Sequence, residues 1–482
     1  MTLKQKTVSG LIWSFIDNIA GLGISFIIGI ILARILSPND FGLVGMLSIF
    51  IAISQSFIDS GFRQSLIRKQ NCTPVDYSTV FYFSITIGVF FYFLLFSCAE
   101  WISVFFQEPM LKILIRVLGL GLIINSFTII QNTLLTKRID FKLQAKISVI
   151  ASIISGIISI YLAYTGWGVW SLIVLTLVKY TVNLLLLYFW CEWKPIWSFS
   201  LKSLNELFSF GSKLLISGLI DTIYRNVYYI IIGKYFTAIE LGYYTRADQF
   251  QSLPSSNIQS IIGRVSYPVL LTIQDDIPRL REAYKKIIKS TMLITFVLML
   301  GMAAIAKPMI YSLIGEKWES SVIYLQMLCM VGMFYPLHAI NLNMLEVQGR
   351  SDLFLHLEII KKVLAVPVII IGVFWGIKIM ILGMMVNTII AYYLNSYWSG
   401  RFIGYPFYTQ LKDILPSFLL AIVMSTVVFV EGWLIPLPMI YLLIIQLITG
   451  AILTFSLCEI TQFKDYLYIK DIIKVKFKSA RE

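Results

Sequence analysis

Residues 32–46 read LARILSPNDFGLVGM, and residues 232–246 read IGKYFTAIELGYYTR. Each stretch closes one long apolar segment and opens the next. Internal repeats of this kind are typical of membrane transporters. The sequence therefore predicts a duplicated bundle of membrane-spanning helices, and the duplication points to transport. The matched positions are Arg34 with Lys234, Ser37 with Thr237, Asp40 with Glu240, Phe41 with Leu241, and Gly42 with Gly242.

Two weaker sequence repeats follow in the same order in both halves. The run KRIDF at residues 137–141 resembles GRSDL at 349–353, and the turn WGV at 167–169 resembles WGI at 375–377. A shared order is expected of two equivalent six-helix units, which enter the membrane from the same side because six is even. We predict two pseudo-symmetric six-helix lobes plus a C-terminal helix pair with a basic tail, at residues 1–200, 201–400 and 401–482.

The composition sets the class of protein. Of the 482 residues, 58% are hydrophobic and 13% are charged, which leaves too little polar surface for a water-soluble body. Because a bilayer core takes about 20 apolar residues of helix, we predict an all-α, polytopic integral membrane protein with about fourteen transmembrane helices. The predicted spans lie near residues 10–33, 41–60, 77–99, 113–134, 147–165, 168–190, 208–232, 243–263, 290–311, 320–343, 357–375, 378–398, 414–430 and 437–457.

The basic residues predict the orientation. With the N-terminus inside, 29 of the 39 Lys and Arg residues fall in cytoplasmic segments and 8 in external ones, in keeping with the positive-inside rule. Both termini are therefore predicted to be cytoplasmic. The net charge of +13 indicates anchoring against anionic membrane lipids, so we expect no nucleic-acid partner.

Several function classes lack their motifs in this sequence. No Walker phosphate loop is present to couple ATP, and no predicted external loop is long enough for a folded catalytic domain. The two histidines and five cysteines show no metal-ligand or redox spacing. We therefore expect a transporter that has no catalytic residues and needs no metal or cofactor.

Two basic segments have the pattern of surface helices. Asp276 and Pro278 can start a helix in which an apolar stripe, from Leu280 to Ile288, lies opposite a row of basic residues. That pattern predicts an interfacial helix. The basic tail at residues 464–481 either lies on the membrane or is simply solvated.

Polar residues inside the spans are the main functional signal, because hydrocarbon makes them costly. They recur at helical spacing and so share one face of their helix in each span. The sets are Asp17 with Gly21, Ser25 and Gly29; Gln55, Ser56 and Asp59; Asn125, Thr128 and Asn132; Thr176, Lys179 and Asn183; Ser217, Asp221 and Arg225; His338 and Asn341; and Asn387 and Asn395.

We interpret these faces as the lining of a hydrated, cationic cavity between the two halves. Candidate substrate-binding residues are Lys179, Arg225, Arg246, Asn183 and Asn125. Purely structural roles stay open as alternatives. Asp221 and Arg225 can form an ion pair along the helix, Lys179 can extend its amine to the membrane surface, and Asn and Ser can form hydrogen bonds between helices.

Several sequence motifs resemble those of a known protein family. Taken in order, these motifs resemble the Wzx-type polysaccharide exporters of the multidrug/oligosaccharidyl-lipid/polysaccharide (MOP) exporter superfamily, in particular the colanic-acid and teichuronic-acid exporter branch. The similarity covers residues 1 to about 460. The motifs are LARILSPNDFG at 32–42, IDSGFRQSLIRK at 58–69, LGYYTRADQFQSLP at 241–254, GRVSYPVLLTIQDD at 263–276, IGEKW at 314–318, and the pair Gly349-Arg350.

The resemblance implies a fourteen-helix flippase in the bacterial inner membrane. Such a protein moves a polyprenyl-pyrophosphate-linked oligosaccharide, a repeat unit of O-antigen, capsule or exopolysaccharide, between leaflets by alternating access. It implies membrane lipids, a polysaccharide polymerase and assembly proteins as partners. The family motifs do not prescribe substrate-binding residues, so the residues proposed above come from this chain alone.

The source of energy and three other functions stay open. Without an ATPase motif, an ion gradient, the membrane potential or consumption of the product must drive transport, and Asp17 and Asp221 are the ion-coupling candidates. A peptidoglycan-precursor flippase or a drug or cation antiporter would share the fold. A membrane-embedded polymerase or ligase is the alternative from another class of protein.

Overall fold

The computed structural model describes residues 20–479, and within them it contains helices and no strands. Ten of these helices are long and apolar enough to cross a bilayer, and a bent pair, α5 (Leu111–Ser126) with α6 (Ile129–Lys137), is long and apolar enough when its two helices are taken together. The predicted spans near residues 243–263 and 357–375 coincide with α10 and α15. Of the span predicted near residues 10–33, residues 20–33 lie in the helix Ala20–Ile35, and residues 10–19 lie outside the described residues. Large apolar side chains such as Phe93, Trp101 and Phe374 are exposed, as lipid contact requires. The predicted all-α, polytopic membrane fold is confirmed.

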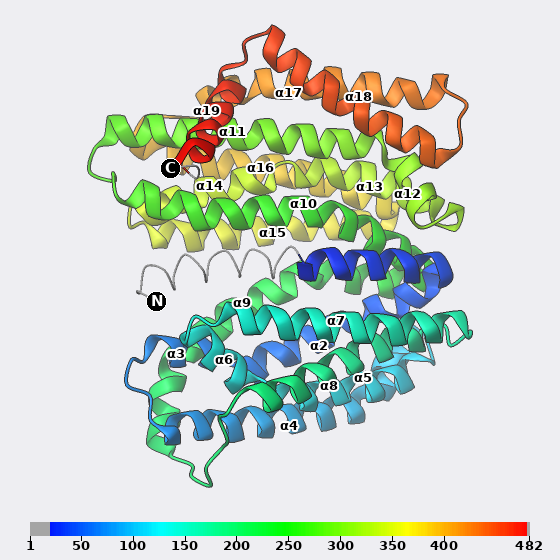
Figure 1. The fold of residues 1–482 in the computed structure, drawn as a ribbon, viewed down its shortest axis with the longest axis vertical. Coiled ribbons are helices and arrows are strands. Elements are labelled where there is room, and N and C mark those ends of the chain that lie inside the picture. The colour runs from blue at the N-terminus through cyan, green and yellow to red at the C-terminus, as the bar shows by residue number, and fades with distance from the viewer. Residues whose placement is uncertain (1–19, 480–482) are drawn as a thin grey trace. The chain divides into compact units, whose positions relative to one another are not determined.

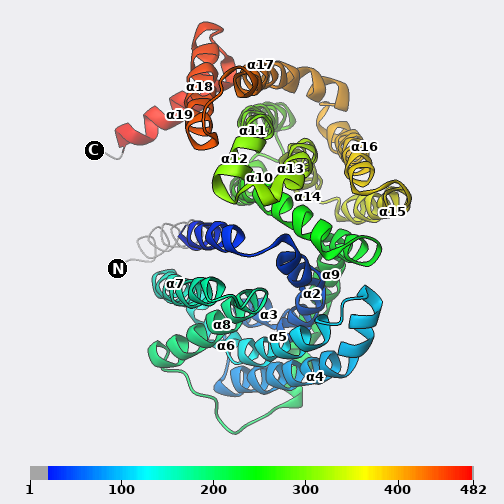
Figure 2. The ribbon, with the colours of Figure 1, turned by 90° about the vertical axis from the view of Figure 1, so that its right-hand side faces the viewer.

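The chain divides into two compact units, of which unit 1 is Met1–Gly242. Within unit 1, α4 packs against α5, α5 against α8, and α7 against α8 (Figure 1, Figure 2). Besides α5 and α6, its helices are α2 (Pro38–Asp59), α3 (Phe62–Arg68), α4 (Pro74–Phe106), α7 (Phe141–Tyr164), α8 (Trp170–Trp190) and α9 (Leu201–Tyr235).

Unit 2 is Tyr243–Glu482 and takes in all but the first turn of α10 (Ala238–Leu271). Its core helices α11, α13 and α16 pack against one another, and α17 lies along α11. The helices are α11 (Ile277–Ala304), α12 (Ala306–Leu313), the 3-10 turn η1 (Glu316–Trp318), α13 (Glu319–Gly332), α14 (Tyr335–Val347), α15 (Ser351–Trp375), α16 (Ile377–Ile403), α17 (Phe407–Leu434), α18 (Met439–Ile460) and α19 (Lys464–Ser479).

The repeated stretches at residues 32–46 and 232–246 each contain the start of a helix. Ser37 caps α2, because its hydroxyl accepts from the Asp40 backbone N–H while the Asp40 carboxylate accepts from the Ser37 N–H. At the start of α10, the Thr237 hydroxyl accepts from the Glu240 N–H at 3.2 Å. The repeated Ser/Thr-x-x-acid pattern therefore starts a helix in both copies.

The two copies of this stretch also pack on each other through matched residues. A Cβ placed on Gly42 would lie 1.7 Å from the Ala238 carbonyl oxygen, and one on Gly242 would lie 1.9 Å from the Pro38 carbonyl oxygen. Only glycine permits this backbone contact. We call it the glycine crossing. It explains why glycine occupies both matched positions.

Helix α9 packs with unit 1 over most of its length, against α2, α3 and α4. The division by contacts falls after Gly242, whereas the sequence repeat places α9 at the start of the second lobe. The lobe boundaries at residues 200 and 400 stay a prediction about the repeats, and the contacts describe packing.

The prediction of an interfacial helix near residues 276–289 is wrong. Asp276 does cap a helix with Pro278 in its first turn, but that helix is the start of the long α11. Leu280, Tyr284 and Ile288 are fully buried inside unit 2 and do not face a membrane surface. An apolar stripe next to basic residues therefore meant protein contact here.

Candidate functional site

Unit 1 contains an open polar cavity of about 320 Å³. Its walls come from the end of α2, from α3, and from the junction of α5 with α6. Seven of the nine lining residues are polar or charged. The lining residues are Gln55, Ser56, Ile58, Asp59, Arg63, Asn125, Thr128, Ile129 and Asn132.

The cavity lies where two membrane helices are interrupted. Between α2 and α3, Ser60 and Gly61 adopt left-handed conformations, with φ of 44° and 67°. Between α5 and α6 the axis bends by 42°, and the Thr128 hydroxyl donates to the Asn125 carbonyl oxygen at 2.8 Å. Backbone that leaves the helix at membrane depth is tolerated only inside protein or beside water. Broken helices accordingly mark binding sites in many transporters.

Side-chain amides are held in place along one wall. The Asn125 Nδ2 donates to Gln55 Oε1 at 2.7 Å, and the Thr128 hydroxyl lies 3.3 Å from Asn125 Oδ1. The Gln55 Nε2 is 3.4 Å from the Tyr180 hydroxyl on α8. Each amide therefore uses part of its hydrogen-bonding capacity on a neighbour, and the remaining donors and acceptors are left for water or a ligand.

Two charged residues complete the lining. Asp59 lies beside Arg63, whose backbone N–H and guanidinium are its favourable partners. The Arg63 guanidinium also donates to Thr136 Oγ1 at 3.3 Å. Among the described residues no donor reaches Asp59 Oδ1. The cavity thus combines a guanidinium donor, a carboxylate acceptor and several amides.

This arrangement fits binding better than bond-breaking chemistry. A volume near 320 Å³ lies at the lower end of the roughly 300–1,000 Å³ range of small-molecule sites. The lining holds neither a nucleophile with a base nor a histidine. Within the described residues no group of three or more His, Cys, Asp or Glu side chains is placed to hold a metal ion. Amides and a carboxylate suit a ligand with many hydroxyl groups.

The predicted site residues lie in several places. Of the five predicted substrate-binding residues, Asn125 alone lines the cavity. Lys179 and Asn183 are half-buried on α8, and Lys179 precedes the Tyr180 that contacts Gln55.

The other predicted residues lie farther along the chain. Asp221 and Arg225 are exposed on α9, on either side of Thr222, whose hydroxyl is 3.3 Å from that of the cavity residue Ser56. Arg246 is half-buried on α10 in unit 2, and Asp17 lies outside the described residues.

Most residues that line the cavity were not predicted as site residues from the sequence. Gln55, Ser56, Asp59, Thr128 and Asn132 stood in the polar sets but were not chosen as site residues, because ionisable residues deep in spans took precedence. Arg63 was missed altogether. The available signal was the Ser-Gly pair at residues 60–61, since such pairs punctuate helices.

Comparison with known proteins identifies the family of the chain. The model of a family described as "Polysaccharide biosynthesis protein" matches residues 31–323. The lipopolysaccharide biosynthesis protein WzxC of Escherichia coli (strain K12) is 26% identical over 444 residues, which cover 88% of this chain and 89% of that protein. The teichuronic acid biosynthesis protein TuaB of Bacillus subtilis (strain 168) is 25% identical over 362 residues, 73% of each chain.

A solved structure shares the fold. The lipid II flippase MurJ in its inward closed conformation superposes with a TM-score of 0.74 at 16% identity, covering 95% of this chain and 100% of that one. The predicted resemblance to Wzx-type exporters of the MOP superfamily is confirmed by the family match and by these relatives. The chain belongs to the polysaccharide biosynthesis protein family.

Proposed function

We propose that this protein is a flippase that moves a polyprenyl-pyrophosphate-linked oligosaccharide across the bacterial inner membrane by alternating access. One observation carries the proposal: an amide-lined polar cavity between two broken membrane helices, in a chain whose relatives are named for polysaccharide biosynthesis. In this proposal Gln55, Asn125 and Asn132 bind hydroxyl groups of the sugar head group.

The physical chemistry of the task favours this arrangement. A sugar cannot shed its hydration in hydrocarbon, because each polar group left without a partner there costs several kcal/mol. The polyprenyl tail is already stable among lipid chains. A polar cavity in the protein therefore has to carry only the head group, while the tail stays in the bilayer.

The charged residues predicted from the sequence complete the proposal. Lys179, Arg225 and Arg246 would meet the pyrophosphate through charge-assisted hydrogen bonds. Asp17 and Asp221 would couple transport to an ion gradient. Both termini would lie in the cytoplasm, and a polysaccharide polymerase would use the delivered repeat unit.

Reconstitution tests the function directly. The purified protein is placed in proteoliposomes that carry the lipid-linked oligosaccharide of its own strain, and an impermeant oxidant of sugars reports how much substrate lies in the outer leaflet. We expect the wild-type protein to equilibrate the substrate between leaflets much faster than protein-free liposomes. Equal rates in the two preparations would refute the function.

A further inference from the structure

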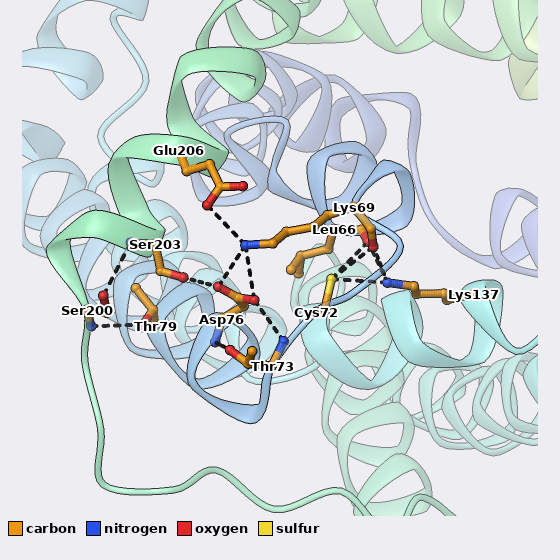
Figure 3. A network of polar contacts seen from close by, with 10 residues as sticks. All are labelled: Leu66, Lys69, Cys72, Thr73, Asp76, Thr79, Lys137, Ser200, Ser203 and Glu206. Carbon is orange, nitrogen blue, oxygen red and sulfur yellow. Dashed lines mark hydrogen bonds and ion pairs between the residues drawn. The ribbon is translucent and has the colours of Figure 1, made fainter.

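Helix α9 is bonded to unit 1 at its first turns. Figure 3 shows the contacts: Lys69 lies 3.2 Å from Asp76 and 3.1 Å from Glu206 of α9, and the Ser203 hydroxyl donates to Asp76. Asp76 is almost fully buried. Partial burial works against the charged form of Lys69, but its hydrogen bonds to Glu206 and Asp76 raise its pKa above the usual value. We call these four residues the clasp.

The linker before α9 is fixed to the same corner of unit 1. The backbone N–H of Ser200 donates to Thr79 Oγ1 at 3.1 Å, and that of Ile196 donates to Ser78 Oγ at 3.0 Å. Ser78 and Thr79 are fully buried near the start of α4. The helix therefore has little freedom at the end where it enters unit 1.

Farther along, one face of α9 stays in contact with α2 and α3. The Ser65 hydroxyl donates to the Leu207 carbonyl oxygen at 3.0 Å. A Cβ on Gly61 would lie 2.4 Å from the Gly211 carbonyl oxygen, so the two backbones touch. Beyond them come the pair of Ser56 with Thr222 and the contact of Gly233 with Met46. The contact positions recur at helical spacing and so lie on one side of α9, while residues 212–220 between Gly211 and Thr222 are mostly exposed.

We propose that α9, although it begins the second sequence repeat, is a fixed part of unit 1 throughout the transport cycle. The chain starts to move with unit 2 only beyond the glycine crossing at Gly42 and Gly242. Asp221 and Arg225 then keep a constant position relative to the cavity, so unit 1 carries both an amide-lined and a charged part of one site. This inference rests on the proposed alternating-access function.

A reversible crosslink tests the inference. The five native cysteines are replaced, and Met46→Cys in α2 with Gly233→Cys in α9, two contacting positions outside the cavity lining, are joined by a disulfide. If α9 never leaves unit 1, the crosslinked protein keeps at least about half of the flipping rate of its own reduced form. A loss of flipping that a reductant restores would overturn the inference and leave the flippase function intact. The two single-cysteine variants are the controls for oxidation.

A distance measurement decides the inference even if no flipping is found. Spin labels on Lys213→Cys in α9 and Thr86→Cys in α4, both exposed positions, report their separation by pulsed EPR with and without the lipid-linked oligosaccharide. We expect one unchanged distance. A second population shifted by about one helical turn, roughly 5 Å, would show that α9 moves against unit 1 and would overturn the inference.

Discussion

Unit 1 and unit 2 interrupt the same helix of the repeat but use the interruption differently. In unit 1 the break between α5 and α6 opens on the polar cavity, where Asn125 and Asn132 line free space. In unit 2 the break between α13 and α14 is packed: the side chain of Gln251 lies against Gly332 at the end of α13. One copy of the duplicated helix thus faces a cavity, and the other faces protein.

Asparagines near each break show the same contrast: Asn125 lies just before the break in unit 1, and Asn341 lies after the break in unit 2. In unit 2 the Tyr284 hydroxyl donates to Asn341 Oδ1 at 2.9 Å, the Ser399 hydroxyl donates to the same oxygen at 2.6 Å, and Asn341 Nδ2 donates to the Leu337 carbonyl at 2.8 Å. Asn341 is fully buried, whereas Asn125 lines the cavity. Polar residues in membrane helices therefore serve two purposes in one chain. They line a cavity in unit 1 and hold helices together in unit 2.

The largest expected effect on stability comes from breaking the unit 2 network. Asn341→Ala leaves the buried hydroxyls of Tyr284 and Ser399 without their acceptor, and each unpaired group costs about 1–3 kcal/mol. We expect a loss of about 2–5 kcal/mol, read as a marked fall in unfolding temperature and in the amount of folded protein in the membrane. Unchanged stability would mean that unit 2 does not depend on this network.

The matching change in unit 1 should reduce flipping and spare stability. Asn125→Ala removes the hydrogen bond to Gln55 Oε1, but that oxygen lines an open cavity where water can replace the lost donor, so unfolding should shift by only about 1 kcal/mol. If the amide binds sugar, one lost hydrogen bond of about 1.4 kcal/mol slows flipping by about tenfold. The rate in proteoliposomes is compared with that of Thr86→Ala, which removes an exposed hydroxyl of α4. Equal rates for the two variants would contradict the binding role.

Paired Tyr→Phe changes sharpen the comparison, because each removes a single hydroxyl. Tyr284→Phe deletes a fully buried donor with a 2.9 Å bond and should cost about 1–2 kcal/mol of stability. Tyr180→Phe deletes a half-buried hydroxyl 3.4 Å from Gln55 and should cost less than about 1 kcal/mol. Thermal unfolding of both proteins in one detergent gives the order. The reverse order would show that the two polar clusters are misassigned.

The smallest effect is expected for the exposed half of the clasp. The Glu206 side chain is 59% exposed, and exposed ion pairs contribute about 0–1 kcal/mol. Glu206→Gln should therefore change the unfolding temperature little, and high salt should abolish even that difference. Ser203→Ala, which removes a donor to the buried Asp76, should cost more. A larger loss for Glu206→Gln than for Ser203→Ala would mean that the ion pair holds α9.

The contrast also shows what the sequence could and could not predict. The predicted spans fall on helices of the described chain because about 20 apolar residues suffice to specify one. The sequence also showed the polar faces of the second and fourth spans. The Ser-Gly pair at residues 60–61 was its one signal of an interruption, and it could show neither the bend at Thr128 nor the contact of Gly61 with the distant Gly211.

The sequence predicted the membrane-spanning helices better than it predicted which polar residues line a cavity. Depth and charge favoured Lys179 and Arg225, while the cavity that the structure contains is lined mostly by uncharged side chains. Asn125 and Asn341 are both amides within apolar spans, and only packing separates the one that lines a cavity from the one that is buried. The roles of Lys179, Arg225, Arg246, Asn183, Asp17 and Asp221 stay predictions.

Access to the cavity residue Asn132 tests the central claim most directly. In a background without the five native cysteines, Asn132→Cys is treated with a membrane-impermeant thiol reagent, with and without the lipid-linked oligosaccharide. If unit 1 holds the sugar head group in a water-accessible cavity, the thiol reacts, and saturating substrate slows the reaction severalfold while inorganic pyrophosphate alone does not. A thiol that never reacts, or one that reacts equally fast with substrate bound, would contradict this account.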